Sequence, residues 1–304
     1  MPETTETQTR QWSGKTGGGN FGQRFLLLFL HRVNVAFLYP VLFLVVPVYC
    51  VVNHKAFGCI FRYFNEIHHF SKWKSFWKTI QNHLVFGKVV LDRFAILAGN
   101  DRQFKIDVPD SRAFEEMLSR PGGFIVAGSH IGNFELVGHF FKQEQKTINI
   151  IVYDGENADF QSKRRESFLA HNVKMIPVRE DLSHIFAIKT ALDRGEIVAI
   201  LCDRIFGSPK ALEVNFFGRP AKFPLGTFVL AAQMEVPVVT LVAVKQRGTR
   251  YRGFVNVLPA PTEKMNIRGR SKFIAENYAA TLENILKRYP EQWFNFYDFW
   301  GNEI

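Results

Sequence analysis

The stretch that decides the fold is PGGFIVAGSHIGNFELVGHF, residues 121–140. An apolar run ends in the small residues Gly128 and Ser129, and a helix is expected to begin near Asn133. A strand, a tight turn and a helix in this order are typical of an α/β protein. His130 is therefore predicted to lie at the carboxyl end of a strand, where open α/β sheets place their ligand sites.

The same alternation continues outward from this segment. Further short runs rich in β-branched residues predict strands at 148–152, 197–201, 236–244 and 251–257, in addition to 124–127. Helical stretches lie between and after them, at 111–119, 133–142, 160–170, 183–193, 224–234 and 271–289. Strands that alternate with helices of this length predict an α/β fold with a mostly parallel central sheet flanked by helices.

The N-terminal part of the chain has a different character. Residues 1–32 form a polar, glycine-rich segment, and the run from Val33 to Val52 contains no charged side chain. Twenty helical residues reach about 30 Å, enough to cross the hydrocarbon layer of a bilayer. We therefore expect residues 33–53 to form a membrane-anchoring helix, followed by an amphipathic helical region at 56–98. Pro40 and Pro47 leave a kinked span and a helix lying in one leaflet both open, and a buried core helix is the alternative.

Composition excludes some classes of protein. The 304-residue chain is 47% hydrophobic, with 31 phenylalanines, so it is not a disordered protein. Its three cysteines form no Cys-x-x-Cys pair, which argues against structural zinc. The net charge of +10 predicts an acidic partner, such as an anionic lipid or an acidic carrier. The basic cluster at 163–165 is too short to indicate a nucleic-acid binding arm.

His130 and Glu135 are the residues best suited to acid–base chemistry. Glu135 follows five residues after His130 on the first turn of the expected helix, from which it can reach back to the imidazole. A histidine held by a carboxylate is a general base, and the chain contains no G-x-S-x-G nucleophile elbow. This combination favours attack by the hydroxyl of an acceptor molecule. A core histidine beside a surface glutamate is the plain alternative, and a metal site of His130, Glu135 and His139 is another.

Two later segments add candidates at the same edge of the sheet. Asp203 and Arg204 directly follow the predicted strand at 197–201. They indicate either a functional site or an ordinary ion pair in a loop. FFGRPAKFPLGT, residues 216–227, supplies Arg219, Lys222 and a helix start, all suited to phosphate. A loop with solvated cations is the alternative there.

These segments, in this order, resemble the lysophospholipid acyltransferase superfamily, and within it the late acyltransferases of lipid A biosynthesis. The family's H-x-x-x-x-D/E motif matches SHIGNFE at 129–135, and its Asp and following Gly match Asp203 and Gly207. Its later blocks match FFGRPAKFPLGT, VPVVTLVAV (236–244) and PEQWFNFYDFW (290–300). The chain departs from the glycerolipid members at Leu225, where they usually carry Glu, and from many lipid A members at Ile205 and in the tail at 297–299.

The resemblance implies an acyltransferase domain at 54–304 that moves a fatty-acyl group to a hydroxyl of a membrane lipid precursor. The donor would be an acyl carrier protein or coenzyme A thioester, with His130 and Glu135 as catalytic residues and without an acyl-enzyme. Substrate would be bound by Arg164, Arg165, Asp203, Arg204 and Arg219. The resemblance implies no cofactor, no metal and no nucleic acid, and a location at the bacterial inner membrane with the catalytic domain on the cytoplasmic face. Another lipid or polyene acceptor, a hydrolytic thioesterase and a non-catalytic membrane protein that binds acyl carriers are the alternatives, and a basic nucleic-acid binder is a further one.

Overall fold

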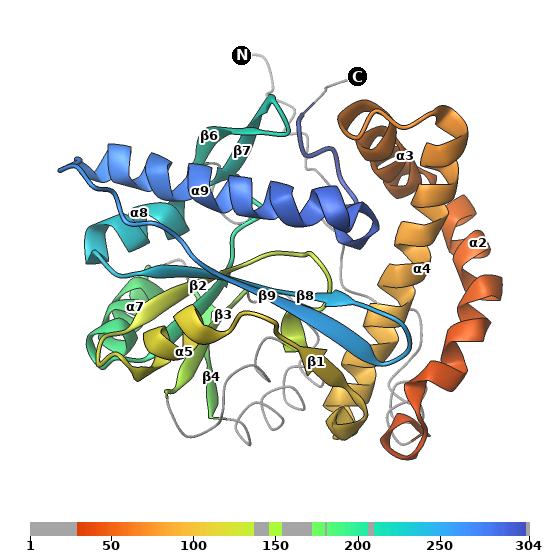
Figure 1. Cartoon of the computed structure of the whole chain (residues 1–304), viewed down its shortest axis with the longest axis horizontal. Coiled ribbons are helices and arrows are strands. Elements are labelled where there is room, and N and C mark those ends of the chain that lie inside the picture. The colour runs from red at the N-terminus through yellow and green to blue at the C-terminus, as the bar shows by residue number, and fades with distance from the viewer. Residues whose placement is uncertain (1–28, 137–145, 154–171, 180, 206–209, 302–304) are drawn as a thin grey trace, which may run out of the picture.

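A seven-stranded sheet forms the centre of the computed structural model, which describes residues 29–136, 146–153, 172–179, 181–205 and 210–301 (Figure 1). The strand order is β1-β9-β8-β2-β5-β3-β4. The strands are β1 (Lys105–Asp107), β2 (Phe124–Gly128), β3 (Ile148–Tyr153), β4 (Val173–Val178), β5 (Ile197–Leu201), β8 (Val238–Lys245) and β9 (Arg250–Val257). All neighbours are parallel except β8 and β9, which form an antiparallel pair. The predicted α/β class with a mostly parallel sheet is confirmed.

Some strands escaped prediction for physical reasons. β1 has only three residues, and β4 carries Lys174 and Pro177 at the edge of the sheet, so neither shows a long apolar run. The segment expected to be a turn before a helix is a separate hairpin of β6 (Ala211–Phe216) and β7 (Arg219–Pro224). Phe217 and Gly218 form its turn with positive φ angles of 56° and 75°. The expected helix does follow, as α8, at Leu225.

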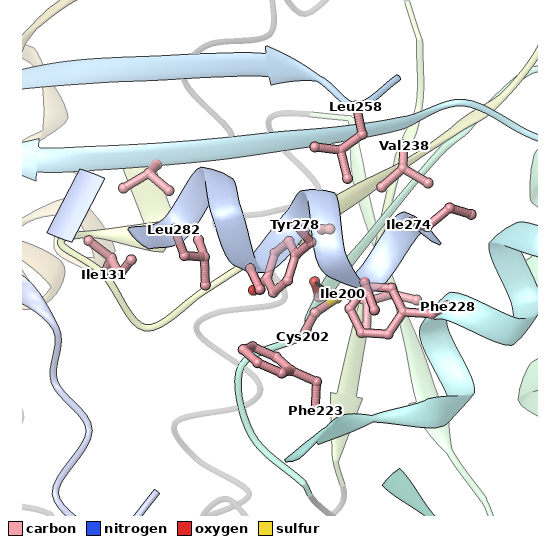
Figure 2. Packing of buried hydrophobic residues seen from close by; sticks show 14 of the residues in the cluster. Ile131, Ile200, Cys202, Phe223, Phe228, Val238, Leu258, Ile274, Tyr278 and Leu282 are labelled. Carbon is pink, nitrogen blue, oxygen red and sulfur yellow. Dashed lines mark hydrogen bonds between the residues drawn. The ribbon is translucent and has the colours of Figure 1, made fainter. Parts of the chain in front are cut away.

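Helices cover both faces of the sheet because the side chains of β2 alternate between them. Phe124 and Val126 pack with α5 on one face. Ile125 and Ala127 pack in a larger cluster with α8 and α9 on the other. Figure 2 shows Tyr278 and Leu282 of α9 directed into this cluster. The helices in this part of the chain are α5 (Arg112–Ser119), α7 (Ser183–Asp193), α8 (Leu225–Met234) and α9 (Ile267–Arg288), and the 3₁₀ turn η5 (Pro290–Gln292) follows α9.

The N-terminal helices form a layer beside the sheet. They are η1 (Val35–Val41), α2 (Leu42–Val52), α3 (His54–Arg62), the π-helical turn η2 (Tyr63–Ile67), α4 (Lys72–Leu97) and the short turn η3 (Asp101–Gln103). The apolar run Val35–Val52 is long enough to cross a membrane, as expected, but its helices pack along α4 (Figure 1). The helical region expected at 56–98 is interrupted, because η2 ends at Ile67 and α4 begins only after the Ser71 side chain caps its first turn.

A buried charged cluster joins this layer to the sheet. Lys245 of β8 forms an ion pair with Asp92 of α4, and the hydroxyl groups of Tyr39 and Tyr251 also bond to Asp92. Four separate elements therefore meet at one carboxylate. Because a buried charge is costly unless it is paired and hydrogen-bonded, this cluster favours one position of η1 and α4 against the sheet.

Candidate active site

The register of two neighbouring strands brings His130 and Asp203 together. Gly128, the last residue of β2, is paired with Leu201, the last residue of β5. His130 and Asp203 each follow two residues later, so both leave the same edge of the sheet side by side. Nδ1 of His130 lies 2.7 Å from Oδ1 of Asp203. The predicted position of both residues at the carboxyl ends of strands is confirmed.

The loop that carries His130 is held from two sides. The carbonyl oxygen of His130 accepts a hydrogen bond from the backbone N–H of Phe294, and the N–H of Gly132 donates to Gln292. Asn133 donates from its backbone N–H to the carbonyl of Ala243. Gly132 has a φ of +62°, and a Cβ there would lie 2.0 Å from the carbonyl oxygen of Ala243. Only glycine fits this close approach of the loop to β8.

Asp203 is fully buried beneath the imidazole. Besides the ring nitrogen, it accepts hydrogen bonds from the backbone N–H of His130 at 2.8 Å and from the indole N–H of Trp293 at 3.0 Å. Burial by itself raises the pKa of this carboxyl, but the contact with His130 and the charge of Arg204 outweigh it and lower the pKa to about 2. Asp203 is therefore ionised at neutral pH and suited to accept from Nδ1–H. The sequence assigned it to substrate binding, whereas its side chain has no exposed surface.

His130 is held in a neutral form with one nitrogen available. Burial lowers its pKa, Asp203 raises it, and the charges of Arg204 and Arg93 lower it further, so the net direction is below the ordinary value. With Nδ1 directed at Asp203, Nε2 is the nitrogen that can take a proton. The side chain is 20% exposed, so a substrate can reach it. The pair has the base and orienting carboxylate of a hydrolase triad.

Glu135 has a different partner from the one expected. Its Oε1 lies 2.5 Å from Nη2 of Arg93, which comes from α4. Arg93 also lies over the ring of Phe134, 4.7 Å from its centroid, and that ring makes an edge contact with His130. The carboxylate on Nδ1 of His130 is that of Asp203, because the helical turn that begins at residue 134 directs Glu135 toward α4.

The remaining predicted site residues are dispersed. Arg204 donates to the carbonyl of Phe294 and lies over the ring of Tyr297. Arg219 bonds to the carbonyl of Glu66 at 3.2 Å, on the side of the hairpin that faces η2. Arg164, Arg165 and His139 lie outside the residues that the structure describes. Within the described ranges, no group of three or more His, Cys, Asp and Glu side chains is arranged to hold a metal ion.

Two neighbours of the site carried no usable signal in the sequence. Arg93 belongs to a long amphipathic helix, where one more cation among lysines is unremarkable. Trp293 lies in the tail segment that resembled the family, but its bond to Asp203 depends on tertiary contacts.

Ser129 and Cys202, the hydroxyl and thiol nearest in sequence to the pair, are both buried, and burial raises the pKa of the Cys202 thiol. Neither is exposed as a nucleophile.

Comparison with known proteins bears on this geometry. The family model described as bacterial lipid A biosynthesis acyltransferase matches residues 82–301. That range contains the sheet, His130, Asp203 and Trp293, and it begins within α4. No curated protein matches the chain closely enough to count as a relative.

Proposed function

This chain belongs to the bacterial lipid A biosynthesis acyltransferases, and from that premise we propose that His130 catalyses transfer of a fatty-acyl group from a carrier thioester to a hydroxyl of a lipid A precursor. The observation that carries the proposal is the contact of His130 Nδ1 with a buried, ionised Asp203. That contact leaves Nε2 to accept the proton of an acceptor hydroxyl. The thioester would be that of an acyl carrier protein or coenzyme A.

The reaction we propose is direct transfer without an acyl-enzyme. The acceptor oxygen attacks the thioester carbonyl while its proton passes to Nε2 of His130, and Asp203 stabilises the imidazolium. The tetrahedral intermediate then collapses, the C–S bond breaks, and the proton passes from Nε2 to the departing sulfur. Burial of both Ser129 and Cys202 supports this route over a covalent one.

Arg93 and Glu135 take a second role in this proposal. The charges of Arg204 and Arg93 both lower the pKa of His130, so both cations lie near the imidazole, and in this proposal the charge of Arg93 also stabilises the oxyanion of the intermediate. Glu135, almost fully buried, positions Arg93 through the 2.5 Å ion pair. In this proposal Glu135 still contributes to the reaction, but Asp203 is the residue that orients the imidazole ring. We retain Arg164, Arg165, Arg204 and Arg219 as candidates for contacts with substrate phosphates.

We further propose that the enzyme works at the cytoplasmic face of the inner membrane, with residues 33–53 as the membrane segment and 54–304 as the catalytic domain. One side of η1 and α2, including Tyr39, Leu42 and Val46, packs on α4. The opposite side exposes large apolar side chains: Phe37, Val41, Phe43, Leu44, Val45, Val48, Val51 and Val52. A helix with one side packed on protein and the other apolar is suited to lie in one leaflet rather than to span the bilayer.

A test of the catalytic proposal uses the full chain in detergent. With an acyl carrier protein thioester and a lipid A precursor, we expect a product one acyl group heavier and one equivalent of free thiol. His130→Ala should lower kcat by about 10² to 10⁴ without changing the Tm. The acylated product is followed by mass spectrometry, and coenzyme A thioesters compared in the same assay identify the donor. Thiol release with free fatty acid, at the same rate without acceptor, would identify a thioesterase instead.

A further inference from the structure

Segment 291–294, which follows α9, holds both members of the proposed catalytic pair. The backbone N–H of Phe294 donates to the carbonyl oxygen of His130 at 3.1 Å. The indole N–H of Trp293 donates to the carboxylate of Asp203 at 3.0 Å. A displacement of this segment would therefore move both the base and the carboxylate that orients it.

Two buried side-chain amides hold this segment in place. Asn82 of α4 donates from its amide nitrogen to the carbonyl oxygens of Glu291 and Trp293, at 3.0 and 2.9 Å. Gln292 forms two hydrogen bonds of 2.7 Å with the backbone N–H and carbonyl of Lys245 in β8. In Figure 1 the dark blue turn after α9 lies beside α4. The segment is thus fixed to a helix and to a central strand of the sheet.

The bonds of Asn82 lie on either side of a contact with the catalytic loop. Between the two carbonyls that Asn82 holds, the carbonyl of Gln292 accepts a hydrogen bond from the N–H of Gly132 at 2.8 Å. Asn82 is fully buried, so water does not replace its amide if the side chain is changed. Backbone carbonyls that lose their donor in a buried place are destabilised, and the segment that carries them is expected to shift.

We propose that Asn82 is a positioning residue for acyl transfer, which acts through segment 291–294 on the geometry of His130 and its carboxylate. Gln292 has the same role from the side of β8. Reaction rates are sensitive to such support, because a misplacement of about 1 Å can cost about 10²-fold. This assignment rests on the proposed function, and it deepens that function by naming the contacts that hold the base in place.

The decisive variant is Asn82→Leu, which keeps the approximate size of the side chain and removes both hydrogen bonds. We expect kcat to fall about ten- to a hundredfold, because the base is no longer held at its working distance. The KM values for the thioester donor and for the lipid A precursor should stay unchanged, since Asn82 contacts neither in this proposal. Gln292→Met should give the same pattern, and it decides the question if Asn82→Leu does not fold.

Asn149→Leu is the matched stability control. Asn149 is also buried, and its amide donates to the carboxylate of Glu196 at 2.7 Å and to the carbonyl of Ile197 at 3.2 Å. These bonds lie at the start of β5, at the opposite end of the sheet from the site. Both variants should lower the Tm, but at a temperature well below it only Asn82→Leu should lower kcat. An equal loss of kcat in both variants, or a normal kcat in Asn82→Leu, would refute the positioning role.

The pKa of His130 provides a second readout, which needs no substrate. It is measured by NMR on the full chain in detergent with labelled histidines, and His130→Ala identifies the signal. Burial is the largest cause that lowers this pKa, and the charged groups that act on the ring are those of Asp203, Arg204 and Arg93. If the segment shifts, the ring gains solvent. We therefore expect the pKa to rise toward the ordinary value in Asn82→Leu and to stay unchanged in Asn149→Leu.

This readout separates the positioning role from the proposed function. A raised pKa in Asn82→Leu would support the positioning role even if the product assay identified a thioesterase. Transfer that depends on His130, together with a wild-type pKa and kcat in Asn82→Leu, would refute the positioning role and leave the proposed function in place.

Discussion

At the scale of single residues, the proposed chemistry depends on the two ring nitrogens of His130 having different partners. Nδ1 faces a carboxylate that accepts several hydrogen bonds and is ionised, so the tautomer with the proton on Nδ1 is favoured. In the proposed mechanism Nε2 is then the acceptor of the substrate proton. The same residue would be an inert core histidine if its outer nitrogen were bonded to protein.

Asp203→Asn should therefore lose most of the activity without unfolding the chain. The amide can donate to Nδ1, which places the ring proton on Nε2 and removes the base. We expect kcat to fall by about 10² to 10⁴. In Glu135→Gln the kcat should fall less, because the amide oxygen still accepts a hydrogen bond from Arg93. Asp193→Asn, an exposed carboxylate paired with Lys189, is the control and should leave kcat unchanged. A larger loss in Glu135→Gln than in Asp203→Asn would assign the orienting role to Glu135.

The pH dependence of kcat/KM should report the lowered pKa of His130. The neutral imidazole is the active form, so activity falls as pH drops through the pKa of the free enzyme. Because burial and nearby cations lower that pKa, the acid limb should lie below the ordinary histidine value of 6.5. Arg93→Gln removes one of those cations and should move the limb to higher pH. Lys189→Gln on α7 is the control, and a limb that shifts equally in both variants would exclude a local effect of Arg93.

At the scale of elements, the site depends on how the loop after β2 is fastened. Its contacts run to β8 on one side and to the C-terminal tail on the other, and Ile131 and Trp293 form an isolated β-bridge. The loop that carries His130 is therefore positioned by segments more than 100 residues away in the chain. At Gly132 the backbone of the loop comes so close to the backbone of β8 that there is no room for a side chain.

Gly132→Ala should be far more destabilising than its matched control. Both Gly132 and Gly218 have positive φ angles, and an alanine costs about 1–2 kcal/mol at either position for that reason. A Cβ at Gly218 meets nothing within 4 Å, whereas at Gly132 it would overlap the carbonyl of Ala243. We expect Gly218→Ala to lower the free energy of unfolding by about 1–2 kcal/mol, and Gly132→Ala by at least about 1 kcal/mol more. Equal losses in chemical denaturation would mean that the loop does not approach β8 as described.

At the scale of the whole molecule, the apolar side of the N-terminal layer extends beyond the long apolar run. Trp73, Phe76 and Trp77 form a ring cluster on the first turns of α4, and the two tryptophans are 72% and 52% exposed. Phe76 also contacts Phe57 of α3. Lysines 72, 74 and 78 flank the cluster. Tryptophan beside lysine is typical of positions at the membrane interface.

Replacing both tryptophans, Trp73→Ala and Trp77→Ala together, should weaken binding to vesicles that contain anionic lipids. The partition coefficient should fall about tenfold or more, since each buried aromatic ring contributes about 1.5–3 kcal/mol. Flotation with the full chain at low detergent measures it. Phe186→Ala is the control, because Phe186 is 74% exposed on α7, outside the N-terminal layer. If both variants lose binding equally, or neither does, this cluster is not part of the membrane face.

Particular elements show why prediction succeeded for some features and failed for others. β2, β5 and β8 were predictable because strands buried on both faces are continuous apolar runs. β6 and β7 were not, because β7 contains Pro220 and Pro224, and proline in a short run argues against a strand even where buried and exposed residues alternate. The break between two helices at 68–71 was not predicted either, since the apolar periodicity continues across it.

The fold class, the apolar N-terminal helix and the two strand ends that carry His130 and Asp203 could all be predicted from the sequence. Those features depend on local periodicity and on residues close together in the chain, which remain readable without a partner segment. The carboxylate that contacts the imidazole could be identified only from the folded chain, because it depends on the register of β2 against β5. The folded chain likewise shows that Glu135 pairs with Arg93 and that the tail at 290–301 supports the site. Hydrogen bonds act over about 3 Å, so their partners are chosen by the packing of distant segments and not by spacing along the chain.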